Sequence, residues 1–261
     1  MHHMNMTHFF ILEITVLYTA ISALILYPAA MHYSNKKHRQ WKKRRYFLFA
    51  IGVIISASAL TGPLAHLSHS DFTFHMLGHL LLGMLGPLFI LNGKPMTLIM
   101  RTLNVTHARK LSEILNMTYV KFISNPIVAL ILNIGGLFWI YKTGLFELMH
   151  TSVLLFALVH LHVFLAGYLF TMSIIYIDIV TYRYSFLYRA AVLIAALGFH
   201  KILSKLIYAS PPAGIPIQDG ERGAMLMYYG GDIVDLALII ILCLEWYKRA
   251  ERSRVQTVKM I

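Results

Sequence analysis

The sequence predicts an all-α integral membrane protein, a bundle of about seven transmembrane helices. Of its 261 residues, 58% are apolar and 13% are charged, and the mean hydropathy is +0.65. This leaves too little polar surface to cover a water-soluble globule. Apolar stretches near the roughly 20 residues that one span requires recur along the chain, and basic residues gather in alternate connections between them.

The expected spans follow from the apolar stretches alone. They are 9–31, 46–66, 74–92, 125–141, 151–177, 186–208 and 224–247. The first stretch is expected to remain as an anchor, because it is too long for a removed signal peptide and seven basic residues follow it within 36–45. Around this membrane domain (9–247) we expect a histidine- and methionine-rich tail (1–8) and a basic tail (248–261).

The basic residues also predict the orientation, since cytoplasmic loops retain lysine and arginine. Nineteen of the 23 fall in 32–45, in 93–124, around 183–189 and after residue 247. We therefore expect a multi-pass protein of the cell membrane with its N-terminus outside and its C-terminus cytoplasmic. The net charge of +12 then reflects topology and contact with anionic lipid rather than nucleic acid. Residues 106–115 are typical of a basic amphipathic helix on the inner surface.

Histidine is the most informative residue type, because 11 of the 14 fall on the outer side in this topology. His75 and His79 are four residues apart, so they share a helix face and can hold one metal ion together. Imidazole suits copper, zinc, iron or nickel, and a thioether such as that of Met76 favours Cu(I). A lone histidine in a span more often bonds a neighbouring helix. Two further histidines close by, His66 and His69, favour a metal site instead.

Later spans carry more candidate ligands at a depth similar to that of His79, judged from a rise of about 1.5 Å per residue. These are His160 or His162, His200, Asp232 and Asp235. Ionisable groups inside a bilayer cost about 2.5–3.5 kcal/mol each, so they usually mark function. For the two aspartates, two interpretations are open. They balance charge beside the metal, or they pair with Lys201 and Lys205 and join two spans.

The N-terminal tail is rich in groups that bind copper. Its candidate capture ligands are His2, His3, Met4 and Met6. A disordered terminus without a role is the alternative. The single cysteine, Cys243, excludes a disulfide framework and a CxxC metal-transfer motif.

Two segments resemble the CtaG-like cytochrome c oxidase assembly factors. Residues 75–82 run into Gly86-Pro87 and then 91–95, which is similar to the family's HMxxH-LL segment and its P-to-L-G-x-P stretch. Residues 162–170 are similar to its H-x-x-F-L-x-G-x-L-F span. There are two departures. Residues 219–227 follow the D-Q-Q-x-x-G-x-x-M element only loosely, and Tyr141 stands where many members have histidine.

The resemblance implies a seven-span protein that helps to load copper into a terminal cytochrome c oxidase without catalysing a reaction itself. Its partners would be an oxidase subunit and the lipid bilayer. The residues alone imply an outward-facing site of histidine, methionine and aspartate for Cu(I) or Cu(II). Two other classes remain open at this point. Histidines at matching depth suit a b-type haem, and intramembrane charges suit a metal transporter.

Overall fold

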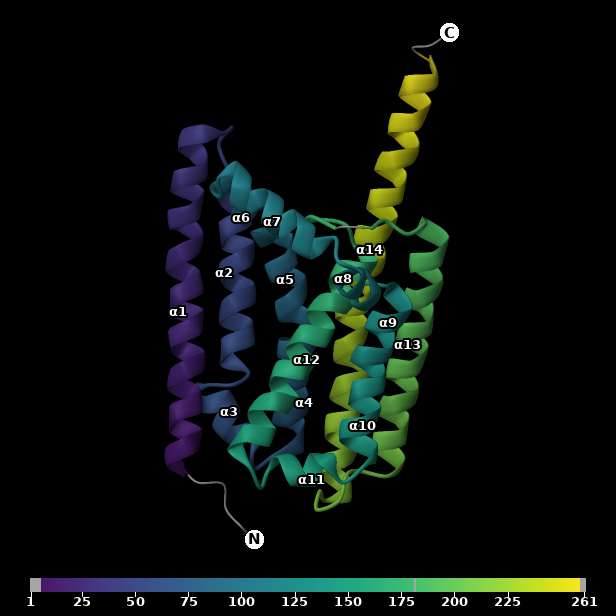
Figure 1. The fold of residues 1–261 in the computed structure, drawn as a ribbon. Coiled ribbons are helices and arrows are strands. Elements are labelled where there is room, and N and C mark those ends of the chain that lie inside the picture. The colour runs from purple at the N-terminus through teal and green to yellow at the C-terminus, as the bar shows by residue number, and fades with distance from the viewer. Residues whose placement is uncertain (1–5, 181, 259–261) are drawn as a thin grey trace.

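The computed structural model describes residues 6–180 and 182–258, with only the backbone of Met6 and of 252–258. These residues form helices joined by short connections, and no strand occurs among them. The helices stand side by side in one bundle, with α1 on one flank and α13 and α14 on the other (Figure 1). The predicted all-helical fold is confirmed.

Two short stretches are π-helical turns within longer helices. The elements in order are α1 (Met6–Lys37), α2 (Lys43–Ser58), α3 (Gly62–Ser68), α4 (Phe72–Leu80), the π turn η1 (Leu81–Leu85), α5 (Gly86–Asn92), α6 (Pro95–Thr102), α7 (Val105–Leu115), α8 (Thr118–Ile123), α9 (Pro126–Leu130), the π turn η2 (Ile131–Gly135), α10 (Gly136–Lys142), α11 (Leu145–Met149), α12 (Val153–Ile174), α13 (Phe186–Ala209) and α14 (Ile217–Val258).

Five helices in the described ranges are long and apolar enough to cross a membrane. They are Thr7–Lys37, Phe72–Asn92, Val153–Ile174, Phe186–Ala209 and Ile217–Glu251. The bent pair α2 and α3 makes a sixth if it is counted as one span, and Pro126–Lys142 is a shorter apolar helix. The membrane class is therefore supported, with five or six spans by length and composition where the sequence predicts seven.

The expected span 46–66 is not one continuous helix. It bends by 40° between Ser58 and Gly62. Gly62 adopts φ +72°, a conformation that favours glycine, and Pro63 follows at the start of α3, where its missing N–H costs nothing. The N–H of Gly62 donates to Glu13 Oε1 at 3.0 Å, so the freed backbone group at the bend is paired with α1.

Both predicted tail boundaries fall inside helices of the structure. Helix α1 begins at Met6, inside the tail predicted over 1–8. Helix α14 continues without a break from Ile217 to Val258, past the expected end of the last span at residue 247. Because basic side chains are compatible with helix, the change in composition after 247 does not end it.

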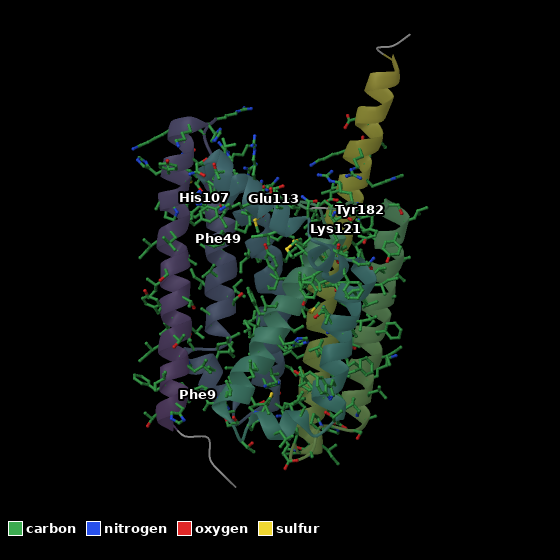
Figure 2. The ribbon with its side chains drawn as sticks, viewed as in Figure 1. Phe9, Phe49, His107, Glu113, Lys121 and Tyr182 are labelled. Carbon is green, nitrogen blue, oxygen red and sulfur yellow. The ribbon has the colours of Figure 1, made fainter. Side chains whose placement is uncertain are left out.

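The bundle has two chemically different ends. Helices α6, α7 and α8 lie at one of them, where α1 ends and α14 projects outward; we name this the basic end (Figure 1). His107, Glu113 and Lys121 lie there, whereas Phe9 lies near the opposite end, which we name the histidine end (Figure 2). Helix α7 has no buried residue, as expected for the amphipathic helix predicted over 106–115.

Polar contacts hold the helices together at the basic end. The guanidinium of Arg189, only 1% exposed, donates to Glu245 Oε2 at 3.0 Å and to the carbonyl of Ile174. This joins α12, α13 and α14. The carboxylate of Asp178 accepts from the backbone N–H of Met96 in the first turn of α6 at 2.8 Å, where a helix N-terminus favours negative charge.

A close helix crossing positions the interior near the histidine end. A Cβ atom on Gly167 of α12 would overlap the carbonyl oxygen of Gly83 in η1. Only glycine permits this approach of the two backbones. It brings α12 against the turn that follows α4.

Candidate functional site

Six histidines and one tyrosine form a cluster that begins at the histidine end and continues into the bundle. They come from α4, α10, α12, α13 and two connections. The histidine cluster consists of His69, His75, His79, Tyr141, His150, His160 and His200.

Neighbouring rings in the cluster are evenly spaced. The ring centroids of His69 and His150 lie 5.9 Å apart, and those of His150 and His75 lie 6.2 Å apart. His75 lies 6.2 Å from His160. Deeper in the bundle, His79 lies 6.3 Å from His200, and the ring of Tyr141 contacts both His75 and His79.

The members of the cluster differ in burial. His69 and His150 are half-buried in the connections at the histidine end, whereas His75 and His79 are each 7% exposed and His200 is 3% exposed. The imidazoles thus lead from the surface into the interior.

Helix α4 sets the position of the first buried pair. Asp71 caps its N-terminus, and the Asp71 side chain accepts from the N–H of Thr73 at 2.7 Å, as expected of an N-cap residue. His75 and His79 follow one turn apart, and both border the same small cavity. Phe72 stacks on the His75 ring with an interplanar angle of 12°, which helps to hold that ring in place.

Hydrogen bonds to carbonyl groups orient two of the rings. His160 Nδ1 lies 2.8 Å from the Phe156 oxygen, and His150 Nδ1 lies 2.8 Å from the Phe146 oxygen. Because a carbonyl only accepts, each Nδ1 carries the hydrogen. In neutral imidazole the lone pair is then on Nε2, the arrangement common to histidines that bind metals.

Several buried ring nitrogens in the cluster have no hydrogen-bond partner within the described ranges. They are both nitrogens of His79, Nε2 of His200 and Nε2 of His69. Buried polar atoms are nearly always paired. Unpaired nitrogens at the centre of a histidine cluster therefore favour a bound ligand at this place.

Two small cavities border the deeper part of the cluster. Each has a volume of about 20 Å³, enough for roughly one water-sized ligand. The outer cavity is bordered by His75, His79, Tyr141, Met149 and His160. The inner cavity is bordered by His79, Met84, Asn133, Thr171, His200 and Asp235.

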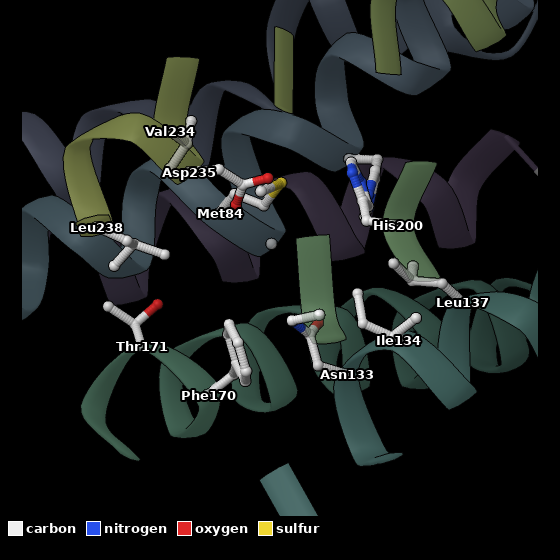
Figure 3. A pocket seen from close by; sticks show the side chains of 13 residues that line it. Met84, Asn133, Ile134, Leu137, Phe170, Thr171, His200, Val234, Asp235 and Leu238 are labelled. Carbon is white, nitrogen blue, oxygen red and sulfur yellow. The ribbon is translucent and has the colours of Figure 1, made fainter. Parts of the chain in front are cut away.

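Figure 3 shows the inner cavity from close by, with Asp235, Met84 and His200 across from Asn133 and Thr171. Both π turns contribute to its wall. Met84 lies in η1, and Asn133 lies in η2. Such turns are rare and are frequent at functional sites.

His162 is not part of the cluster. It lies two residues after His160, and two residues turn a helix by about 200°, so only one of the two can face the interior. His162 is exposed, packs over Gly136, and its Nε2 lies 3.1 Å from the Leu132 oxygen. The structure thus places His160, and not His162, among the candidate ligands.

The two aspartates of α14 have different surroundings. Asp232 pairs with Lys201 at 2.9 Å, so the pairing interpretation applies to this residue. Asp235 is 5% exposed and borders the inner cavity. Lys205 lies over the Tyr228 ring at 6.0 Å and has no aspartate partner among the described residues.

The remaining candidates lie at or beyond the surface. His66 is exposed, and its Nε2 lies 3.5 Å from Glu13 Oε1. His2, His3 and Met4 lie outside the described residues, and only the backbone of Met6 is described.

Three residues of the cavities were not predicted from the sequence. Met84 follows His79 by five residues, a spacing that places two side chains on one face only across a π turn. Met149 and Asn133 come from segments without a ligand motif. The one sequence feature that could have indicated Met149 is that it directly precedes His150.

The imidazole and thioether groups that border the two cavities suit a soft monovalent ion. Among the described residues no group of three His, Cys, Asp or Glu side chains is arranged to hold a metal ion. A metal–nitrogen bond of about 2 Å puts each ring centroid roughly 3 Å from the ion, so centroids about 6 Å apart correspond to two imidazoles that face one ion from opposite sides. Met149 and Met84 add one thioether to each cavity. Neutral imidazole with thioether favours Cu(I).

His69 lies outside the spans and has a perturbed acidity. Burial, followed by the charges of His150 and His66, lowers the pKa of His69 to about 4. Its imidazole is therefore neutral at physiological pH, which is the form that binds metals.

The fold and the cluster define a class, a multi-span helical membrane protein with buried imidazole and thioether groups. Residues 25–249 match the cytochrome c oxidase caa3 assembly factor family. The chain belongs to this family.

Curated relatives occur in mycobacteria. An uncharacterized protein of Mycobacterium leprae (strain TN) is 23% identical over 259 residues, which is 91% of this chain and 39% of the relative. An uncharacterized protein of Mycobacterium bovis is 27% identical over 181 residues, which is 67% of this chain and 27% of the relative. The chain thus spans well under half the length of these relatives. No solved structure matches the sequence.

Proposed function

We propose that this protein binds copper in the histidine cluster and helps to insert it into a terminal cytochrome c oxidase, without catalysing turnover. The observation that carries this proposal is the group of nitrogens on His79 and His200 that have no partner among the described residues and lie beside the thioether of Met84. Membership of an oxidase assembly factor family supports the oxidase as the partner.

The proposal includes a cell-membrane topology of seven spans. Pro126–Lys142 would be the additional span and the bent pair α2 and α3 would count as one. The basic end would be cytoplasmic and the histidine end outside. The concentration of basic residues at one end of the bundle supports this orientation.

In this arrangement the surface histidines would receive the ion. His69 and His150 are the half-buried members, so an ion reaching them from outside would next meet His75. The N-terminal His2, His3, Met4 and Met6 would raise the local ion concentration near this surface.

The size of the cavities favours an ion over a haem. Each of the two cavities between the histidines has about 20 Å³, whereas ligands of drug size take about 300 Å³ or more. The larger grooves, of about 580 and 460 Å³, border only one histidine each, His160 and His162. Neither groove offers two axial imidazoles.

Transport across the membrane would need polar groups that continue towards the basic end. The inner cavity is closed on that side by Leu238, and buried Leu242 and Ile174 lie further along. These apolar side chains separate the inner cavity from the buried Arg189–Glu245 pair at the basic end, which favours holding and release on one side of the membrane.

Copper analysis of the purified protein tests the binding step. The double variant His75→Ala, His79→Ala should insert normally but lose tightly bound copper, since each cavity loses a principal ligand. His162→Ala is the matched control, because it removes an imidazole of α12 that lies outside the cluster. Unchanged copper in the well-folded double variant would contradict the site.

A deletion strain tests the delivery step. Its oxidase should contain normal haem but too little copper, and raised external copper should partly restore activity by mass action. An oxidase with its full copper complement at every copper level would contradict the proposed role and favour haem binding or transport.

A further inference from the structure

His79 forms part of the wall of both cavities. The outer cavity brings it together with His75, His160 and Met149. The inner cavity brings it together with other donors, His200, Met84 and Asp235. Both nitrogens of the buried His79 ring lack partners in the described part of the chain. No other histidine of the cluster borders both spaces.

We propose that one Cu(I) ion has two positions in series, an outer and an inner one, and that His79 is the ligand common to both. The inference rests on the proposed copper binding and specifies its path. Bonds to the outer donors break as bonds to His200 and Met84 form, while His79 stays bound. No electron or proton is transferred, because one nitrogen of His79 holds the ion throughout while its other nitrogen keeps the hydrogen.

Charge distinguishes the two positions. The inner cavity is bordered by the carboxyl group of Asp235, which is 5% exposed and has no hydrogen-bond or ion-pair partner among the described residues. Its neighbour Asp232 is already paired with Lys201. A buried carboxylate stabilises a buried cation, because attraction is strong where water is excluded. No acidic residue borders the outer cavity. The ion should therefore rest at the inner position after passing the outer one.

The backbone around the inner position also differs from that around the outer one. Without the π turn η1, Met84 would not share a face with His79. The π turn η2 supplies Asn133 on the opposite wall. The outer cavity, by contrast, is bordered by one π turn, through Leu82 of η1.

The test is competition between the full-length purified protein and a chromophoric Cu(I) chelator, with the uptake rate measured in parallel. Met84→Leu and Asp235→Asn alter only the inner position, Met149→Leu alters only the outer one, and His79→Ala alters both. Leucine replaces methionine at nearly equal volume, so these variants should fold.

The proposal predicts one Cu(I) in every variant except His79→Ala. Met84→Leu and Asp235→Asn should weaken binding by about 10- to 100-fold, as the ion returns to the outer position. Met149→Leu should keep the wild-type affinity but take up Cu(I) more slowly. His79→Ala should lose the ion.

Two results would overturn the two-position path. If the inner variants bind no Cu(I) at all, no outer position exists. If Met149→Leu changes neither the affinity nor the uptake rate, the outer position is not used. A wild-type protein that binds no Cu(I) would instead refute the proposed copper function itself, so the two failures are distinguishable.

Discussion

The hydroxyl oxygen of Tyr141 lies 3.1 Å from Nε2 of His75, inside the outer cavity. The same tyrosine ring contacts His79 with a centroid distance of 6.2 Å. Tyr141 thus stands between the two histidines of α4, at the place where the resembled family often has histidine. A ligand at His75 Nε2 must first displace this hydroxyl group.

Replacement of Tyr141 by phenylalanine tests this relationship. A hydrogen bond contributes about 1 kcal/mol net, so freeing His75 Nε2 should raise the Cu(I) affinity of the outer position roughly fivefold, measured by chelator competition in the Met84→Leu background, where the ion rests at that position. Tyr141→His should raise it further by adding a third imidazole. A lower affinity in Tyr141→Phe would mean that the hydroxyl group helps to hold the ion.

Gly231 makes room for His200. A Cβ atom at this position would lie 2.6 Å from His200 Cε1, so Gly231→Ala should displace the ring from the inner cavity. We expect about a tenfold loss of Cu(I) affinity, as for other changes that disturb ligand orientation. Gly198→Ala is the matched control on α13, because nothing lies within 4 Å of its added Cβ. Equal affinities of the two variants would contradict the role of His200.

The buried ion pair at the basic end should support stability. Arg189→Ala leaves Glu245 partly buried without its partner, a change that typically costs about 3–5 kcal/mol. Thermal unfolding in detergent should show this as a clearly lower midpoint. Lys201→Ala breaks a more exposed pair with Asp232 and should change the midpoint little. Similar unfolding midpoints for the two variants would contradict the expectation that the buried pair contributes more to stability than the exposed one.

Topology is testable by accessibility in intact cells. A tag within 210–216 should be accessible from outside, and tags within 38–42 and at the C-terminus only from inside, because basic residues remain cytoplasmic. Single cysteines at these positions with a membrane-impermeant thiol reagent provide a second readout, after Cys243 is replaced. External labelling of the C-terminus would reverse the side on which the cluster opens.

Local chemistry explains what was predictable from the sequence. Hydropathy over a window of 20 residues requires no knowledge of neighbours, so the helical membrane class followed from composition and segment length. The four-residue spacing of His75 and His79 likewise depends only on the helix repeat, and both border one cavity. The bend near Gly62 was missed because an apolar stretch has the same composition whether it is straight or bent.

Tertiary structure decided which of these residues meet. His160 and His162 are equivalent in composition and depth, and only the contact of α12 with η1 turns His160 inward. The two aspartates of α14 lie three residues apart, and their sequence positions do not distinguish them. In the structure, Asp232 pairs with Lys201, whereas Asp235 borders the inner cavity. Helix spacing constrains neighbours along one chain segment, whereas a site built from four helices depends on how they pack and on π turns that the sequence does not reveal.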